Sequence, residues 1–222
     1  MDADFWHDKW RRGETGFHRP DVNPLLTSWW QALEPVPGSG VFVPLCGKSA
    51  DVIWLRDAGH PVTGVELSRR ALDALGVEQS LNLAWSADDR FATARGQGLT
   101  LYCGDYFALT AADLPAISLV YDRAALIALP EPMRRRYVSH LGQLLPVGWR
   151  MLLVTLEYPR HEREGPPFSL GDEEVRRLFA GCDIDLLFEE DVLGQNPSFA
   201  SQGVSRLVER VYRIVSPRKS RP

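Results

Sequence analysis

Two apolar runs within residues 40–66, separated by a tight turn and a short helical pattern, restrict the fold of this chain more than any other feature. The first run, residues 40–44, leads into the turn Leu45-Cys46-Gly47-Lys48-Ser49, and the second, residues 62–65, ends in Glu66. Near-continuous apolar runs of this length are typical of parallel strands that helices cover on both faces. These residues therefore predict a strand, a turn, a helix and a second, parallel strand that ends in a carboxylate.

The turn and Glu66 are expected to lie together, because the carboxyl ends of parallel strands share one edge of a sheet. Backbone N–H groups of such a turn can bind one end of a ligand, and a carboxylate after the second strand can accept hydrogen bonds from ribose hydroxyls. The alternative is that Glu66 only stabilises the N-terminus of the helix after Ser68, where the helix dipole favours a negative charge. We predict a nucleoside cofactor site at this edge, with Glu66 on the ribose.

The triplet Gly47-Lys48-Ser49 resembles the end of a phosphate-binding loop, but the rest of that motif is missing. The motif needs a glycine five residues before the Gly-Lys pair, and that position holds Phe42, inside the first strand. The G-x-G-x-x-G fingerprint of dinucleotide-binding proteins is absent as well. We therefore predict that Lys48 is a solvated residue at the start of a helix. A phosphoryl-transfer enzyme that uses Lys48 is the less favoured alternative.

The rest of the chain continues the alternation of strands and helices. Further strands are expected at residues 99–103, 117–121 and 150–157, and helices at 23–33, 49–58, 69–75, 132–145 and 172–179. Two more strands, at 184–192 and 204–215, are joined by a Gly/Asn/Pro loop without a helix, so they should form an antiparallel hairpin. We predict a single α/β domain over residues 1–222, with helices on both faces of a seven-stranded, mostly parallel sheet that ends in this hairpin. The layout is Rossmann-like and similar to the class I methyltransferase sheet, an analogy that does not by itself fix function.

Two of the later strands also end in residues that suit a nucleoside site. Asp105 and Tyr106 follow the third strand, where an acid commonly meets an adenine amino group; a capping Asp and a core aromatic residue are the alternative. Arg123 ends the fourth strand. It is either a structural arginine paired with Asp122 or a cation presented to a polar or anionic ligand.

Residues 1–20 are expected to form an N-terminal lid segment. Trp6 and Trp10 are four residues apart, so they share one face of a helix. From there they can cover the pocket as a lid. A tryptophan ring also attracts a cation such as a sulfonium. Packing at the edge of the domain is the alternative interpretation. Residues 216–222 are expected to be a frayed tail.

Composition and charge exclude several classes of function. The net charge is −4, and duplex nucleic acid needs clustered cations. The three cysteines lie far apart without a C-x-x-C pair, which predicts neither a disulfide framework nor a zinc site. The apolar runs are too short for a membrane span, and the N-terminus is unlike a signal peptide. We expect a cytoplasmic protein with no metal, membrane or nucleic-acid partner.

Taken together, these residues are similar to the bacterial branch of the thiopurine S-methyltransferase family. The resemblance covers nearly the whole chain, in order. It includes the stretches 5–10, 15–18, 43–55, 59–66, 102–107, 121–126 and 165–168. The turn Pro44-Leu45-Cys46-Gly47-Lys48-Ser49 is the most specific part, because it stands where other methyltransferases have a glycine-rich loop.

The resemblance implies a monomeric, cytosolic enzyme that depends on S-adenosylmethionine and methylates aromatic or heterocyclic thiols such as thiopurines. It also implies a link to selenium and tellurium compounds, so the expected partner is a small thiol or chalcogen acceptor. The residues that it assigns to the cofactor are Trp10, Leu45, Glu66 and Arg123, with Asp105 and Tyr106 near the adenine. It assigns Phe17 to the substrate side, and we expect Arg123 to favour the acceptor anion as well. A non-catalytic nucleoside-binding sensor is the alternative, because no residue is a dedicated nucleophile or base.

Overall fold

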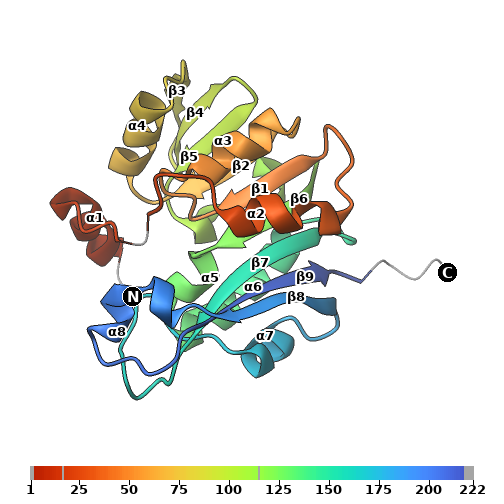
Figure 1. The fold of residues 1–222 in the computed structure, drawn as a ribbon. Helices are drawn as coiled ribbons and strands as arrows, with labels where there is room; N and C mark the ends of the chain where they lie inside the picture. Colours follow the sequence, from red (N-terminus) through yellow and green to blue (C-terminus); the bar gives the residue numbers. More distant parts are fainter. Residues whose placement is uncertain (1–2, 17, 115, 218–222) are drawn as a thin grey trace.

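A parallel sheet forms the centre of the molecule, as expected. The computed structural model describes residues 3–16, 18–114 and 116–217. Five parallel strands lie in the order β5-β2-β1-β6-β7 (Figure 1). Their bounds are β1 Gly40–Pro44, β2 Val62–Glu66, β5 Leu99–Cys103, β6 Ile117–Arg123 and β7 Arg150–Glu157. Since β1 lies between β2 and β6, the strand order reverses beside it, which is where open α/β sheets bind ligands.

Antiparallel strands extend the sheet on both sides, and the sheet has nine strands instead of the predicted seven. On one side, β9 (Val208–Val215) pairs with β7, and β8 (Asp183–Asp191) pairs with β9, which confirms the hairpin. On the other side, β4 (Ala92–Gly96) and β3 (Ala84–Ala87) extend the sheet from β5. These two strands were missed because they are short, and β3 is mostly exposed, so neither has the apolar run that marks a central strand.

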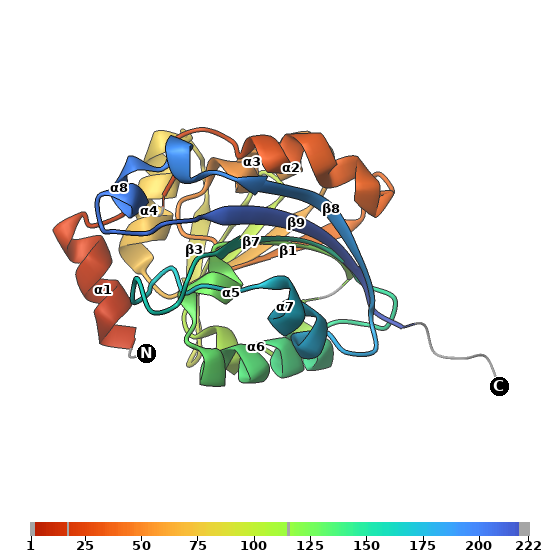
Figure 2. The ribbon, with the colours of Figure 1, turned by 60° about the horizontal axis from the view of Figure 1, so that its bottom comes forward.

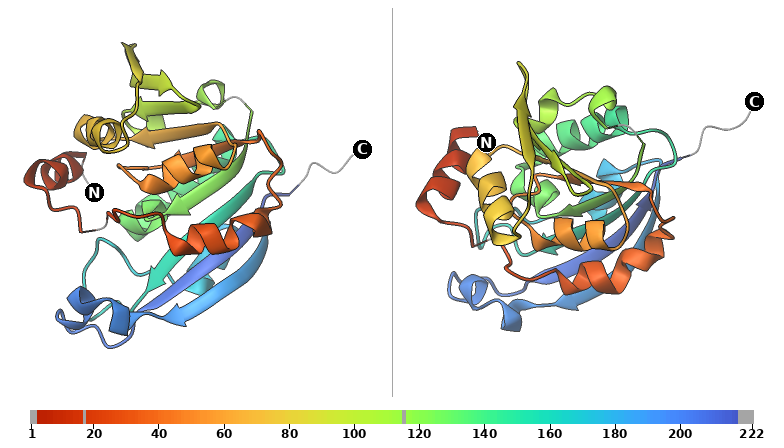
Figure 3. Two further views of the ribbon diagram at one scale, coloured as in Figure 1. Left: turned by 45° about the horizontal axis from the view of Figure 1, so that its top comes forward. Right: turned by 90° about the horizontal axis from the view of Figure 1, so that it is seen from above.

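Helices cover both faces of the sheet (Figures 2 and 3). Each face has its own apolar cluster. One layer contains α2 (Pro24–Trp29), the 3-10 helix η1 (Trp30–Leu33), α3 (Ala50–Asp57) and α4 (Arg69–Glu78). The other contains α5 (Ala125–Ala128), α6 (Glu131–Leu144) and α7 (Asp172–Leu178). The short 3-10 helices η2 (Tyr106–Ala108) and η3 (Ala111–Asp113) lie between β5 and β6 in the chain. None of the helices within the described ranges combines the length and the apolar character that a bilayer span requires.

Local capping explains where several helices begin. The side chain of Asn23 accepts a hydrogen bond from Leu25 N, and that of Ser49 accepts one from Asp51 N, as expected for these residue types. Ser68 precedes α4, but its own side chain makes no capping bond. Its backbone N–H instead donates to Glu66 Oε1 at 2.8 Å, so the start of α4 helps to fix the carboxylate at the tip of β2.

The connection between β8 and β9 contains helical turns, so the prediction of a loop without a helix is wrong. It forms η4 (Leu193–Gln195) and α8 (Pro197–Ala200). The side chain of Asn196 donates to Val192 O at 2.8 Å, and Pro197 occupies the first turn of α8, where its missing N–H is not needed. The predicted second strand accordingly begins later, at Val208.

The N-terminal segment forms α1 (Ala3–Arg12), which packs beside α4 (Figure 3). In Figures 1 and 2, α1 and α8 lie at the same end of the sheet. The predicted tail at 216–222 falls mostly outside the described residues.

Candidate functional site

A cavity of about 750 Å³ opens at the carboxyl ends of the parallel strands. Its walls come from α1, the turn after β1, the tips of β2, β6 and β7, the segment after β5, and the connection that contains α8. A volume in this range suits a drug-sized ligand or a cofactor with a small second molecule. The described residues that the sequence assigned to the cofactor all line this cavity: Trp10, Leu45, Glu66, Asp105, Tyr106 and Arg123.

Glu66 is fixed at the centre of this edge by the backbone. Its side chain is 7% exposed, its Oε2 accepts from Gly47 N at 3.0 Å, and its Oε1 accepts from Ser68 N at 2.8 Å. Burial raises the pKa of Glu66 to about 7, although these N–H groups favour the ionised form. Each oxygen retains acceptor capacity, so the carboxylate can bind two vicinal hydroxyls.

The turn after β1 approaches the N-terminal helix closely. Gly47 has φ +55°, and a Cβ at this position would lie 3.3 Å from Cζ2 of Trp10. Leu45 also has a positive φ, +47°, which is uncommon for a residue with a side chain. Trp6 and Trp10 both line the cavity, and Trp10 is almost fully buried. The turn and the Trp10 ring therefore border the cavity side by side.

The segment after β5 combines the two interpretations that the sequence left open. Asp105 lines the cavity, and its Oδ1 also caps η2 by accepting from Phe107 N. Tyr106 borders the cavity too, but its ring stacks on that of Tyr137 at a centroid distance of 4.7 Å. Its hydroxyl donates to Tyr137 O, so this ring is fixed by the core.

At the tip of β6, Asp122 and Arg123 have separate environments. Asp122 is fully buried and accepts from Tyr137 Oη at 2.6 Å and from Leu126 N at 3.1 Å. Burial raises the pKa of Asp122 to about 6. Because successive side chains in a strand point to opposite faces, Arg123 lies on the other face, at the cavity wall.

Lys48 and Phe17 are the remaining positions that the sequence singled out. Lys48 is not the solvated residue that we expected, since its side chain is 18% exposed and its Nζ lies 2.5 Å from Glu78 Oε1. This pairing neutralises the charge that a phosphate would need. Phe17 lies outside the described residues, although Gly16 and His18 on either side of it line the cavity.

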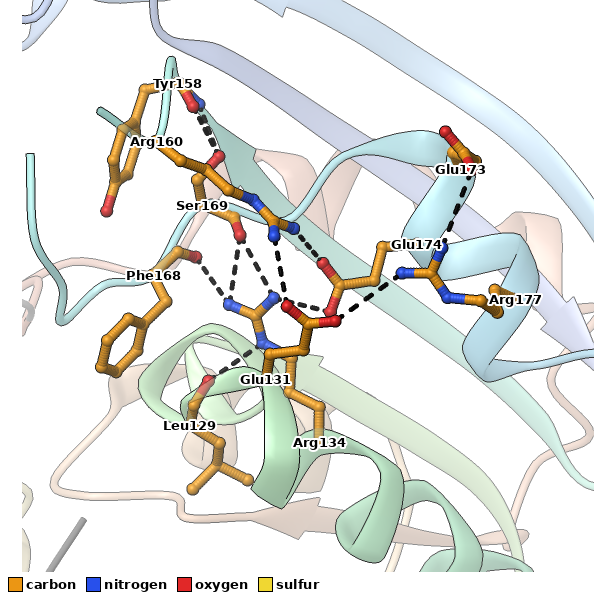
Figure 4. Close-up of polar contacts among 10 residues, drawn as sticks. All are labelled: Leu129, Glu131, Arg134, Tyr158, Arg160, Phe168, Ser169, Glu173, Glu174 and Arg177. Atoms are coloured by element: carbon orange, nitrogen blue, oxygen red, sulfur yellow. Dashed lines mark hydrogen bonds and ion pairs between the residues drawn. The ribbon is translucent and has the colours of Figure 1, made fainter. Parts of the chain in front are cut away.

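The far wall of the cavity includes Pro166 and Pro167, from a stretch that carries the family resemblance. This wall is the segment after β7, residues 158–170. The side chain of Arg134, from α6, is 1% exposed and binds this segment (Figure 4). The Arg134 guanidinium donates to Glu174 Oε1 at 2.9 Å, and to the carbonyl oxygens of Leu129, Phe168 and Ser169. One buried cation thus connects α6, α7 and the wall.

A second layer of charges surrounds Arg134. The other carboxylate oxygen of Glu174 binds Arg160, which also lies 3.3 Å from Glu131 (Figure 4). Ser169 Oγ accepts from Tyr158 N and donates to Tyr158 O, which closes the segment on itself. The wall is therefore positioned by a hydrogen-bond network and not by a regular element.

Arg163 joins the same wall to the helical turns between β8 and β9. It donates to Pro166 O and Pro167 O at 3.2 Å and to Gln202 Oε1 at 2.8 Å. Its guanidinium carbon lies 4.5 Å from the ring centroid of Phe199. Arg163, Phe199 and Gln202 line the cavity, but none of them belongs to a motif that could have indicated this.

Thr155 and Glu209 are two further lining residues that the sequence did not reveal. Thr155 is fully buried, and its Oγ1 has no hydrogen-bond partner among the described residues. Glu209 is half-buried at the start of β9. Within the described part of the chain, no group of three or more His, Cys, Asp or Glu side chains could hold a metal ion.

Comparisons with known proteins agree with this geometry. The sequence model of the family "Thiopurine S-methyltransferase (TPMT)" matches residues 1–217. The chain is 49% identical to a thiopurine S-methyltransferase of Pseudomonas putida over 214 residues, which are 96% of this chain and 99% of the relative. It is 46% identical to the thiopurine S-methyltransferase of Pseudomonas fluorescens over 215 residues, 96% of this chain and 97% of the relative.

A solved structure extends the comparison to the fold. The methyltransferase from Thiobacillus denitrificans, crystallised with S-adenosylhomocysteine, is similar with a TM-score of 0.61 over 98% of this chain and 99% of that one, at 16% identity. At this identity, the similarity concerns the fold alone.

Proposed function

Since the chain belongs to the thiopurine S-methyltransferase family, an S-adenosylmethionine-dependent family of enzymes, we propose that it methylates the sulfur of aromatic and heterocyclic thiols, including thiopurines. The observation that carries the proposal is the large cavity in which the turn after β1, Glu66 and Arg123 meet an apolar wall. One end has the groups that a nucleoside needs, and the other leaves room for a small flat acceptor.

The residues at the first end fit S-adenosylmethionine. Glu66, held by two backbone N–H groups, would accept from the ribose hydroxyls. Asp105 and Tyr106 would lie at the adenine, and Leu45 and Trp10 at the remainder of the molecule. When bound, the cofactor supplies a methyl group on a positively charged sulfur, and the aromatic ring of Trp10 favours such a cation.

At the other end, Arg123 would bind the acceptor as its anion and touch the cofactor. A cation within a few ångströms favours the thiolate over the thiol, and the thiolate is the reactive nucleophile. No strong general base is then required, because alignment and exclusion of water can lower the barrier by several kcal/mol. Phe17 would line this end.

The proposal also covers acceptors other than thiols, and the compartment and oligomeric state in which the enzyme acts. Selenium and tellurium compounds would be further acceptors, because their anions are nucleophiles of the same type. The enzyme would act as a cytoplasmic monomer on small molecules, without nucleic-acid or membrane partners. The sensor and phosphoryl-transfer alternatives lose support from the family membership and from the pairing of Lys48 with Glu78.

The test is to incubate the purified protein with S-adenosylmethionine and 6-mercaptopurine, and to measure the methylthio product by mass spectrometry. Product at a catalytic rate supports the proposal. Arg123→Ala should then lower turnover or acceptor affinity, and full activity of this variant would remove Arg123 from the site. If the protein binds the cofactor and forms no product on any thiol or chalcogen acceptor, the proposal is wrong.

A further inference from the structure

Glu209, at the start of β9, places a carboxylate in the cavity wall, and no residue that the structure describes bonds to it. Antiparallel pairing sets it opposite Leu156 of β7, at the edge where the parallel strands end. It is half-buried and lines the cavity. Among the residues that the structure describes, nothing hydrogen-bonds or forms an ion pair with its side chain.

Neighbouring acids on β7 and β8 differ from Glu209 either in having an arginine partner or in being exposed. Glu157 and Glu189 both bind Arg210. Glu190, directly opposite Glu209 on β8, is exposed to solvent. A partly desolvated carboxylate without a donor costs free energy, so Glu209 is the acid of this hairpin that a ligand inside the cavity can satisfy.

The charges around Glu209 define what that ligand must carry. Arg123 and Arg19 attract its ionised form, whereas burial, the largest effect, and the repulsion of Glu190 raise the pKa of Glu209. A hydrogen-bond acceptor and a cation therefore border the same end of the cavity. The complementary molecule has a negative sulfur for Arg123 and a hydrogen-bond donor for Glu209.

We propose that Glu209 binds the acceptor by accepting a hydrogen bond from a ring N–H or an amino group, and that it thereby selects nitrogen heterocycles among the aromatic thiols. The inference rests on the proposed function, since it concerns which thiol the same cavity takes. 6-Mercaptopurine retains a ring N–H when it loses one proton to form its anion, whereas thiophenol has none. These two acceptors therefore separate recognition by Glu209 from recognition by Arg123.

The experiment compares the wild-type protein, Glu209→Gln and Glu209→Ala on both thiols. Loss of a hydrogen bond to a charged group corresponds to a decrease of about 10- to 100-fold. We expect kcat/KM for 6-mercaptopurine to fall by this factor in Glu209→Ala and by less in Glu209→Gln, with a change below about threefold for thiophenol. Calorimetry of each thiol with the S-adenosylhomocysteine-loaded protein should show the same loss in affinity. Glu190→Gln, one strand away, is the matched control and should behave as wild type.

Other results would overturn the inference. An equal loss on both thiols would assign Glu209 to orienting Arg123, and no loss on either would remove it from the site. A fall in kcat for both thiols with a displaced pH profile would make it a general base. Unchanged S-adenosylhomocysteine affinity shows that a variant is folded. If the wild type methylates neither thiol, the proposed function fails, while the calorimetric comparison still decides the role of Glu209.

Discussion

The two ends of the cavity are built in different ways. At the proposed cofactor end, Glu66 and the turn after β1 lie at the tips of adjacent parallel strands, and backbone N–H groups hold the carboxylate. At the proposed acceptor end, Arg134 and Arg163 hold irregular segments that come from residues 129, 158–170 and 202. One end depends on the sheet, and the other depends on side-chain pairs between distant parts of the chain. The acceptor end is therefore the one that single substitutions should disrupt.

The largest expected effect is that of Arg134→Ala. Removing the cation leaves the buried Glu174 with Arg160, a largely exposed cation, and frees three carbonyl oxygens. Loss of one member of a buried pair typically lowers the free energy of unfolding by about 3–5 kcal/mol. Urea denaturation would measure it, with the exposed neighbour Arg135→Ala as a control. A decrease below about 1 kcal/mol would show that the wall does not depend on this pair.

A pH titration tests the cofactor end. In the ligand-free protein the pKa of Glu66 is about 7, and ribose hydroxyls require the ionised form as acceptor. Affinity for S-adenosylhomocysteine should fall about tenfold between pH 8 and pH 6. At pH values well below the pKa, each further unit should lower the affinity by roughly another factor of ten. Glu66→Gln should bind more weakly and without this pH dependence, as measured by calorimetry. A flat profile for the wild type would contradict the assignment.

Glu66 also affects the stability of the ligand-free fold, and this effect has the opposite dependence on pH. The folded pKa of about 7 lies above the ordinary value of 4.5, so the folded state holds the proton more tightly. The stabilisation is complete below pH 4.5 and is lost as pH rises through 7. Asp122, raised from 3.8 to about 6, acts in the same direction at lower pH. Urea midpoints of wild type and Glu66→Gln at pH 5 and pH 8 would isolate the part due to Glu66, which should favour pH 5.

A smaller effect is expected for Arg163→Lys, which keeps the charge and loses the planar fork that reaches Pro166, Pro167 and Gln202. The KM for the acceptor should rise about three- to tenfold, in keeping with the loss of one or two hydrogen bonds of modest strength. The dissociation constant for S-adenosylhomocysteine should not change. Equal losses at both ends would show that the two halves of the cavity are not independent.

The smallest effect concerns Thr155→Val. The hydroxyl is fully buried and has no partner in the part of the chain that the structure describes, so a methyl group of similar size should raise the free energy of unfolding by up to about 1 kcal/mol. Thr110→Val is the comparison, because the Thr110 hydroxyl donates to Asp113 at 2.8 Å and its loss should destabilise. A destabilised Thr155→Val would indicate that a water molecule or a backbone group satisfies the hydroxyl in solution.

The contrast between the two ends also explains what could be predicted from the sequence. The cofactor end follows from local patterns: an apolar strand, a turn, a capping Ser49 and an acid at the next strand tip. The acceptor end does not, because the pairing of Arg134 with Glu174 joins residues 40 positions apart, and no spacing rule connects them. In the same way, β3 and β4 were missed because pairing determines them more than their own composition does: β4 pairs with β5, and β3 pairs with β4.

The antiparallel direction of β9 has a consequence for biosynthesis. Because β9 runs opposite to β7, its first residues, including Glu209, reach the edge that β1 and β2 occupy much earlier in the chain. The ribosome therefore releases the half proposed to bind the nucleoside well before the residues that close the other half exist. On that proposal, a nascent chain at that stage has a place for the methyl donor and no completed place for the molecule that receives the methyl group.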